Sequence, residues 1–418
     1  MENCELLIKN CKEVVSSQEK FTRGKKMKNI NIWNDIDIAI SGNKIIDMGK
    51  NLKYRPNRVI DASDYVVMPG FIDSHTHLVF SGARDDEYLM RVRGESYEKI
   101  AEKGGGIKNT VSNTRKMSEE ELLEISEKRL KKLLSYGTTT VEIKSGYGLD
   151  KETELKMLRV IKKLDKKYPN TVIPTYLGPH EIPQNYTEEE YIDFVCNEVL
   201  PEIKNKELAV FTDIFTEKGV FSIKSTEKYF KCAQDLGFKL KIHADELNPL
   251  GGAEIAAKYG AYSADHLMEI TDKGIKKLAS SNTVATLLPG TSFFLMKDKY
   301  APARKLIDNN AIVSIASDFN PGSSNGFNMQ FMMNLASLYL KMEIEEIINA
   351  VGINAAKALD LNDRGTIAKN KRADLLFLDI PNYKYLVYQY GLNNVKMVIK
   401  NGKKVIENRL DYLMEEDK

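Results

Sequence analysis

The feature that most constrains the fold is a series of eight short β-rich runs separated by stretches with a helical pattern of apolar residues. Strands that alternate with helices are typical of βαβ units, whose parallel strands form one sheet. Eight such units predict an α/β fold, a (β/α)8 TIM-like barrel over residues 69–360. The runs are VVMPGFIDSH (66–75), TTVEIKS (139–145), TVIPTYLG (171–178), LAVFTDIF (208–215), KLKIHA (239–244), YSADH (262–266), TVATLLP (283–289) and IVSIAS (312–317).

The two ends of the chain have a different pattern. IDIAISGNKIIDMGK (36–50) contains two β-rich runs around Gly42-Asn43, and VKMVIKNGKKVIE (395–407) turns on Asn401-Gly402. Dipeptides of this kind between β-rich runs indicate hairpins. We therefore expect a small composite β-sandwich domain formed by both chain ends, residues 1–68 and 361–418.

One helix of the barrel is marked at both ends. Ser118 stands three residues before Glu121, which is the spacing of a capping box. Apolar residues then recur at helical spacing up to Leu134, and Gly137 is a plausible stop.

Composition excludes several classes of partner. Lys and Arg number 61 and Asp and Glu 59, so the net charge of +2 provides no field that would attract nucleic acid or an anionic membrane. No window approaches the roughly 18 consecutive apolar residues that a membrane helix needs, and the first residues do not resemble a secretion signal. Four cysteines without CxxC spacing predict free thiols in a reducing, cytoplasmic compartment; they are Cys4, Cys11, Cys196 and Cys232.

All five histidines follow or end predicted barrel strands. A barrel builds its active site at the carboxyl ends of its strands, so residues at these positions should meet at one face. Convergence of all five on that face is hard to attribute to packing. The polar residues placed there are His75, His77, Tyr147, His180, Glu217, His243, Glu246, His266, Asp318 and Asn320.

Several of these residue types are metal ligands. Imidazoles together with one carboxylate suit Zn²⁺ or iron, with a position left open for water. His75 and His77 are one residue apart on a strand, so they point to the same face, and His243 and Asp318 can complete the set. Such an ion lowers the pKa of bound water from about 15.7 towards about 7.

Hydrolysis also needs a general base and an acid for the leaving nitrogen. The candidates are Asp318, Glu246 and His266. For Glu246 or His266, an ordinary salt bridge or a hydrogen bond to a metal ligand is an equally good interpretation.

Two glycine-containing segments were considered as anion sites. Gly104–Ile107 has no following Lys-Ser/Thr, so it predicts a loop over the barrel mouth and no phosphate cradle. DFNPGSS (318–324) begins at Asp318, and its backbone N–H groups and the Ser323 hydroxyl could hold an anionic substrate.

With these motifs the sequence resembles the amidohydrolase superfamily, and within it the imidazolonepropionase family of histidine degradation. The superfamily pattern is PGFIDSHTH with a later His and an Asp after strand eight. The narrower resemblance extends over most of the chain, in HTHLVFSGARDDEYLMRVRGESYEKIAEKGGGI, VEIKSGYGL, TYLGPHEIP, KIHADELNPLGGAEIAAKYGAYSADHL, LLPGTSFFL and SDFNPGSS.

The resemblance implies metal-dependent hydrolysis of 4-imidazolone-5-propanoate to N-formimidoyl-L-glutamate in a homodimer. It implies one divalent ion, Zn²⁺ or iron, on His75, His77, His243 and Asp318. The positions that contact substrate or product in that family are Arg84, Tyr147, His180, Glu246, Asn320, Gly322 and Ser323, with Tyr97 as an auxiliary contact. An arginine can bind the propionate through two charge-assisted hydrogen bonds. Departures from the family pattern occur at Glu181, Thr216 and Ser324 and concern loop geometry.

Two alternatives were weighed. Another cyclic-amide hydrolase or an aminoazole deaminase would share the fold, because fold alone does not decide function. Arg84 and the DFNPGSS turn favour a substrate with a carboxylate over an uncharged base. A binding protein that has lost catalysis should lack metal ligands, whereas this sequence retains them.

Overall fold

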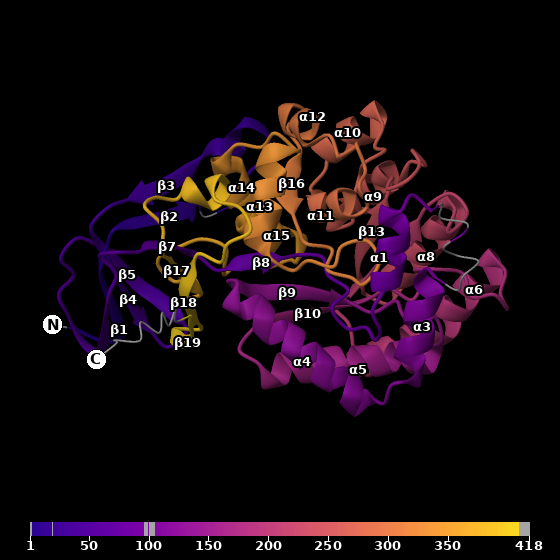
Figure 1. Cartoon of the computed structure of the whole chain (residues 1–418), viewed down its shortest axis with the longest axis horizontal. Coiled ribbons are helices and arrows are strands. Elements are labelled where there is room, and N and C mark those ends of the chain that lie inside the picture. Colours follow the sequence, from indigo (N-terminus) through magenta and orange to yellow (C-terminus); the bar gives the residue numbers. More distant parts are fainter. Residues whose placement is uncertain (1, 19, 96–98, 100–104, 409–418) are drawn as a thin grey trace.

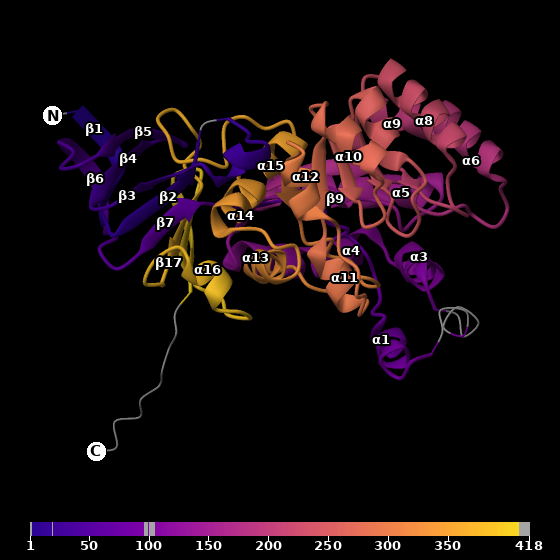
Figure 2. The ribbon, with the colours of Figure 1, turned by 90° about the horizontal axis from the view of Figure 1, so that it is seen from above.

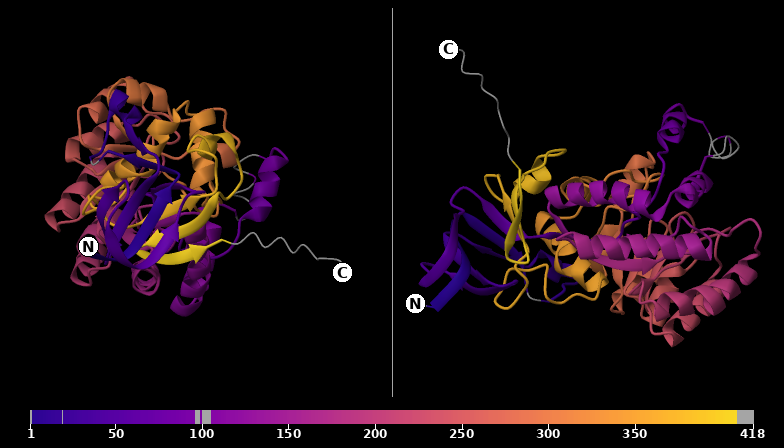
Figure 3. Two further views of the ribbon diagram at one scale, coloured as in Figure 1. Left: turned by 90° about the vertical axis from the view of Figure 1, so that its left-hand side faces the viewer. Right: turned by 90° about the horizontal axis from the view of Figure 1, so that it is seen from below.

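The computed structural model describes residues 2–18, 20–95, 99 and 105–408; Tyr97 and Gly104 lie outside these ranges. Figure 1 shows a barrel wrapped by helices, with the sheets formed by the chain ends packed beside it. The views from above and below in Figures 2 and 3 show the same division. The (β/α)8 barrel and the separate domain from both chain ends, predicted from the sequence, are confirmed.

The barrel is a sheet of parallel strands in chain order, in which the fourth predicted run forms two short strands. The first and last strands are joined by a parallel bridge between Thr76 and Phe319, which brings the ring close to closure. The barrel strands are β8 (Phe71–Asp73), β9 (Thr138–Lys144), β10 (Thr171–Tyr176), β11 (Phe211–Thr212), β12 (Phe215–Thr216), β13 (Lys239–Ala244), β14 (Ser263–His266), β15 (Val284–Leu287) and β16 (Ile312–Ile315).

The two remaining sheets combine segments far apart in the sequence. One has the order β5-β4-β1-β6 and the other β19-β18-β17-β7-β2-β3. Both predicted hairpins, β4–β5 and β18–β19, are present. Their strands are β1 (Glu2–Cys11), β2 (Glu13–Ser17), β3 (Ile30–Trp33), β4 (Ile36–Ser41), β5 (Lys44–Gly49), β6 (Tyr54–Asp61), β7 (Val66–Pro69), β17 (Leu375–Leu378), β18 (Val395–Lys400) and β19 (Lys403–Glu407).

The prediction that residues 66–75 form one barrel strand is wrong, because these residues are divided between two sheets. The first half of this run, β7, pairs with β2 and β17, and only β8 pairs with the barrel strand β9. The chain changes sheet at Gly70, where a Cβ atom would lie 2.2 Å from Thr139 Oγ1. Any larger residue at this crossing would collide with β9, so glycine is required by close approach.

Helices cover the outside of the barrel. The capping box at Ser118 is confirmed: its hydroxyl accepts from the Glu121 N–H, and α4 ends just before Gly137, which has φ 95°. Helix α3 begins directly after Gly106, so the loop predicted over 104–107 ends there. The helices and helical turns are η1 (Gly24–Lys28), α1 (Asp85–Val92), α3 (Ile107–Lys116), α4 (Glu119–Ser135), α5 (Lys151–Lys167), α6 (Glu188–Phe194), η2 (Val195–Val199), α7 (Leu200–Asn205), α8 (Ile223–Asp235), α9 (Gly252–Tyr259), α10 (Asp272–Ala279), α11 (Pro289–Phe294), α12 (Ala303–Asp308), α13 (Met329–Leu338), α14 (Ile344–Val351), α15 (Ile353–Ala358) and α16 (Tyr385–Tyr388).

Two further expectations can be compared with the structure. Within the described ranges, no helix combines the length and apolar character needed to cross a bilayer. The four cysteines carry free thiols, as their spacing predicts.

Candidate metal centre and substrate cavity

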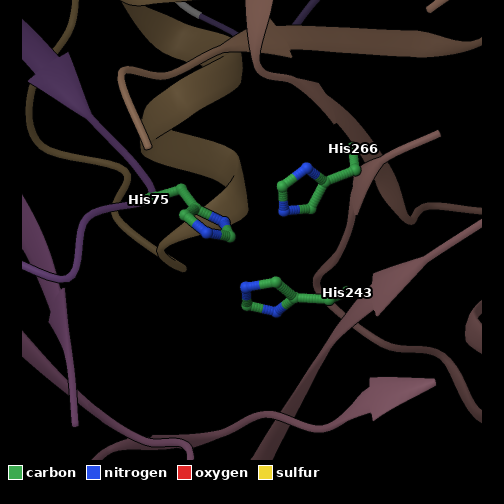
Figure 4. Close-up of side chains that lie close together, drawn as sticks. All are labelled: His75, His243 and His266. Carbon is green, nitrogen blue, oxygen red and sulfur yellow. The ribbon is translucent and has the colours of Figure 1, made fainter. Parts of the chain in front are cut away.

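The predicted metal ligands come together at the carboxyl ends of the barrel strands. His75 and His77 directly follow β8, His243 lies in β13, and Asp318 follows β16. All four side chains are buried. Figure 4 shows the rings of His75, His243 and His266 extending from different elements towards one another.

The spacing of the donor atoms fits one small cation. His77 Nε2 lies 3.3 Å from His75 Nε2 and 3.5 Å from His243 Nε2, and Asp318 Oδ1 lies 3.4 Å from the Nε2 atoms of both His75 and His77. Four donors placed tetrahedrally at the 2.0–2.1 Å typical of zinc–nitrogen bonds are about 3.3–3.4 Å apart. These four spacings suit a divalent metal ion, and His75, His77 and Asp318 form a group that could hold it, with His243 next to His77.

Buried carboxylates lie beside two of these imidazoles. His75 Nδ1 lies 2.6 Å from Asp265 Oδ2, and His243 Nδ1 lies 3.1 Å from Asp213 Oδ2. The hydrogen bond of His75 Nδ1 to Asp265 holds the proton at Nδ1 and leaves the Nε2 lone pair facing the centre, the usual arrangement behind metal-binding histidines. The contact of His243 with Asp213 is a charge contact without hydrogen-bond geometry. The sequence analysis did not single out Asp265, although it immediately precedes His266.

These carboxylates belong to a buried charge network that also includes two lysines. Lys144 Nζ lies 2.7 Å from Asp213 and 2.9 Å from Glu142, and it is 3.6 Å from Asp265. Lys241 Nζ donates to Glu142 Oε2 at 2.7 Å. All five side chains are fully buried, so the lysines offset the cost of burying carboxylates beside the predicted metal ligands.

Burial and the neighbouring charged groups shift the pKa values of the predicted metal ligands. Burial and Lys144 lower the pKa of His75, but Asp265 and Asp318 outweigh them and raise the pKa to about 9. Burial raises the pKa of Asp318, yet hydrogen bonds from His75 and His77 hold it well below the ordinary value. Burial lowers the pKa of His77. Asp318 is thus a carboxylate, and a cation at the centre would replace the proton on His75.

A cavity of about 570 Å³ opens onto three of these donors, His77, His243 and Asp318. It brings together most of the predicted catalytic and substrate-binding residues, and His266 Nε2 lies 3.6 Å from Glu246 Oε2 within it. The cavity is lined by His77, Arg84, Glu87, Arg91, Glu95, Ile107, Tyr147, His180, Glu181, Phe215, His243, Glu246, Leu247, His266, Leu295, Lys297, Asp318, Asn320, Gly322 and Ser323.

Two aromatic side chains stand beside the donors. The His180 ring stacks on His77, with centroids 5.1 Å apart and planes 13° apart, while its Nδ1 pairs with the Gly146 carbonyl at 3.0 Å. Burial and His77 lower the pKa of His180 to about 3, so its imidazole is neutral. Burial raises the pKa of Tyr147, which keeps its hydroxyl protonated as a hydrogen-bond donor.

The turn after Asp318 is rigidly built. Asn320 Oδ1 accepts from the N–H groups of Gly322 and Ser323, and Asn320 Nδ2 donates to Ser323 Oγ. A Cβ atom on Gly322 would lie 2.0 Å from Arg84 Nη1. Glycine at this position therefore lets the guanidinium approach the turn, as a shared anion site would require.

Glu217 differs from the sequence prediction. It lies after β12 at the same face, but its carboxylate accepts from the Leu247 N–H and from Asn248 Nδ2. It is not among the described residues that line the cavity. Its contacts hold the loop that carries Glu246, which is a structural task.

The sequence matches a known protein family along most of its length. The model of the amidohydrolase family matches residues 66–405. A protein named imidazolonepropionase from Bacillus velezensis is 48% identical over 92% of this chain and 92% of its own. One of the same name from Alkaliphilus oremlandii is 45% identical over 97% of this chain and 99% of its own.

Solved structures share the fold at much lower identity. A zinc-bound adenosine deaminase from Xanthomonas campestris is 18% identical with a TM-score of 0.72, covering 96% of this chain and 93% of its own. N-isopropylammelide isopropylaminohydrolase from Burkholderia multivorans is 15% identical with a TM-score of 0.69, and the match covers 96% of this chain and 98% of its own. The chain belongs to the amidohydrolase family of metal-dependent hydrolases and, within it, to the imidazolonepropionase family.

Proposed function

We propose that this protein hydrolyses the cyclic amide of 4-imidazolone-5-propanoate to N-formimidoyl-L-glutamate, the third step of histidine degradation. The observation that carries the proposal is one cavity that joins a metal donor set to the guanidinium of Arg84. The metal donor set suits attack on an amide carbonyl, and the guanidinium suits a substrate carboxylate. The relatives named imidazolonepropionase support the same reaction.

The proposed ion is Zn²⁺ or iron, held by His75, His77, His243 and Asp318. When bound, it would make hydroxide available near neutral pH by lowering the pKa of water. Metal analysis of protein purified without added metal distinguishes the two ions. Removal by a chelator should abolish turnover, and only the native ion should restore it fully.

We infer that Asp318 moves the proton. Its Oδ2 accepts from the Thr291 hydroxyl at 2.7 Å, which fixes the carboxylate plane while Oδ1 faces the imidazoles. We assign it as the base that takes a proton from the attacking water and delivers it to the leaving ring nitrogen.

Glu246 and His266 are the remaining acid–base candidates in the cavity. His266 can donate to the oxygen of the amide as negative charge develops on it. Burial raises the pKa of Glu246, and its carboxyl group can pair with a ring N–H. Tyr147, His180, Asn320, Gly322 and Ser323 complete the proposed substrate contacts.

The remaining properties follow from the family. We infer a cytoplasmic enzyme with domains at 1–68 plus 361–418 and at 69–360, acting as a homodimer without nucleic-acid or membrane partners. Large apolar side chains are exposed on or directly after helices α1, α11, α13 and α16, and they support self-association. Figure 2 shows these helices along one side of the molecule. The exposed side chains include Leu89, Met296, Leu338, Tyr339 and Tyr388.

The direct test gives purified, metal-analysed protein freshly prepared imidazolonepropanoate and follows the loss of its ultraviolet absorbance. Mass spectrometry should identify N-formimidoyl-glutamate, formed only by metal-loaded protein. A folded, metal-loaded sample that leaves this substrate intact would refute the proposal and favour another cyclic-amide hydrolase or an aminoazole deaminase.

Replacement of Arg84 by Ala should weaken substrate binding by roughly 2–3 kcal/mol, the scale of a hydrogen bond to a charged group. The guanidinium lies beside Gly322 in the cavity, so its loss leaves the propionate incompletely paired. KM from steady-state kinetics measures the effect. Unchanged KM and kcat would remove Arg84 from the site.

A further inference from the structure

Helix α1 carries a second arginine into the same cavity. Arg91 lies two turns after Arg84, and Glu87 lies between them on the helix. Glu87 Oε2 accepts from Arg84 Nε at 2.9 Å and from Nη2 at 2.7 Å, so this carboxylate is committed to Arg84. The three side chains all line the cavity.

Arg91 is held in place and only partly paired. Its Nη2 donates to the Gly322 carbonyl at 3.1 Å, which fixes the guanidinium against the turn that follows Asp318. Its Nη1 is buried without a hydrogen-bond partner among the described residues. A guanidinium presents a planar fork that matches a carboxylate, so an unpaired nitrogen beside a cavity requires an acceptor.

The net charge of Arg84, Glu87 and Arg91 also favours a carboxylate as the acceptor for Arg91. Among these three side chains, two positive charges face one carboxylate, which leaves an excess of one. Glu95 and Lys297, which have opposite charges, line the same cavity. Glu87 Oε1 is also unpaired, but its pairing with Arg91 would not change that excess. Burial and the neighbouring Arg84 lower the pKa of Arg91, as expected for a cation that lacks its counter-charge.

We propose that Arg91 is a second carboxylate-binding residue, which together with Arg84 holds the propionate group of the substrate against the Asn320–Ser323 turn. This inference rests on the proposed function, because it assigns the charged end of that substrate. The two arginines, of which only Arg84 is paired with Glu87, then select a five-membered ring that bears an anionic chain over an uncharged heterocycle.

The test measures binding of two unreactive ligands, 3-(imidazol-4-yl)propanoate and its uncharged propanamide, to the metal-loaded full chain by calorimetry. The wild type should prefer the acid. Arg91→Met should reduce that preference by about tenfold while leaving the affinity for the amide unchanged, and Arg91→Lys should recover part of it. Arg93→Met is the matched control, since Arg93 is exposed on the same segment and does not line the cavity.

The outcomes separate this inference from the proposed function. Equal weakening of acid and amide in Arg91→Met would mean that Arg91 only supports the turn through Gly322, and would overturn the inference. A wild-type preference that Arg84→Met abolishes but Arg91→Met preserves would overturn it while leaving the proposed function intact. A wild type that binds acid and amide equally would overturn the inference, while turnover of imidazolonepropanoate decides the proposed function separately.

Discussion

Replacement of Asp318 by Asn should lower kcat by about 10³-fold, within the range for loss of a positioned acid–base group. In the wild type the Thr291 hydroxyl donates to Asp318 Oδ2. The Asn amide has nearly the same size as the carboxylate and can still form a hydrogen bond with Thr291. It cannot accept a proton from water, and it is a poor ligand beside His75 and His77. Steady-state kinetics with imidazolonepropanoate measures the loss.

Two controls distinguish chemistry from folding in this variant. The exposed Asp298→Asn changes the same group outside the cavity and should keep wild-type kcat. The metal content and melting temperature of Asp318→Asn should be determined alongside, because a ligand role predicts weaker metal binding. Near-normal turnover by the metal-loaded variant would assign the base to Glu246 or His266.

Replacement of Lys144 by Met should destabilise the protein by about 3–5 kcal/mol, the cost of removing one partner from a buried charge pair. Lys144 is fully buried and touches Asp213 and Glu142. Without it, these carboxylates face one another in a region that water does not reach. Urea unfolding, followed by circular dichroism, measures the shift of the midpoint.

The exposed Lys128→Met is the control for loss of a lysine, and its midpoint should hardly move because surface pairs contribute little. Adding Asp213→Asn to Lys144→Met should recover part of the stability by removing the uncompensated charge. A single Lys144→Met variant as stable as the wild type would show that the network does not need this cation.

Local patterns predicted the architecture well where one principle governs the outcome. The capping box at Ser118 and the two hairpins depend on neighbouring residues, and both predictions are confirmed. Strand ends also place His75, His77 and Asp318 at one face, because parallel strands share an edge. The roles assigned to these residues remain predictions.

Other features depend on contacts between distant segments and could not be read from neighbouring residues. The division of residues 66–75 between two sheets requires β17, which comes much later in the chain. In the sequence, Lys144 and Asp265 do not differ from other strand residues. Their contacts with charged groups on or next to other strands are visible only in the folded barrel. The position of Arg91, in contrast, follows from local spacing. Arg84, Glu87 and Arg91 are three and four residues apart, which places them on one face of a helix and is visible in the sequence.

The pairing of β7 with β17 has a consequence for synthesis on the ribosome. β7 emerges early, yet its partner on one side is made only after the whole barrel, as the pairing of Pro69 with Leu375 shows. Until then β7 presents an apolar strand edge, the kind of surface on which nascent chains aggregate. A chain interrupted before residue 375 would contain every barrel strand and still lack the strand that covers this edge of β7.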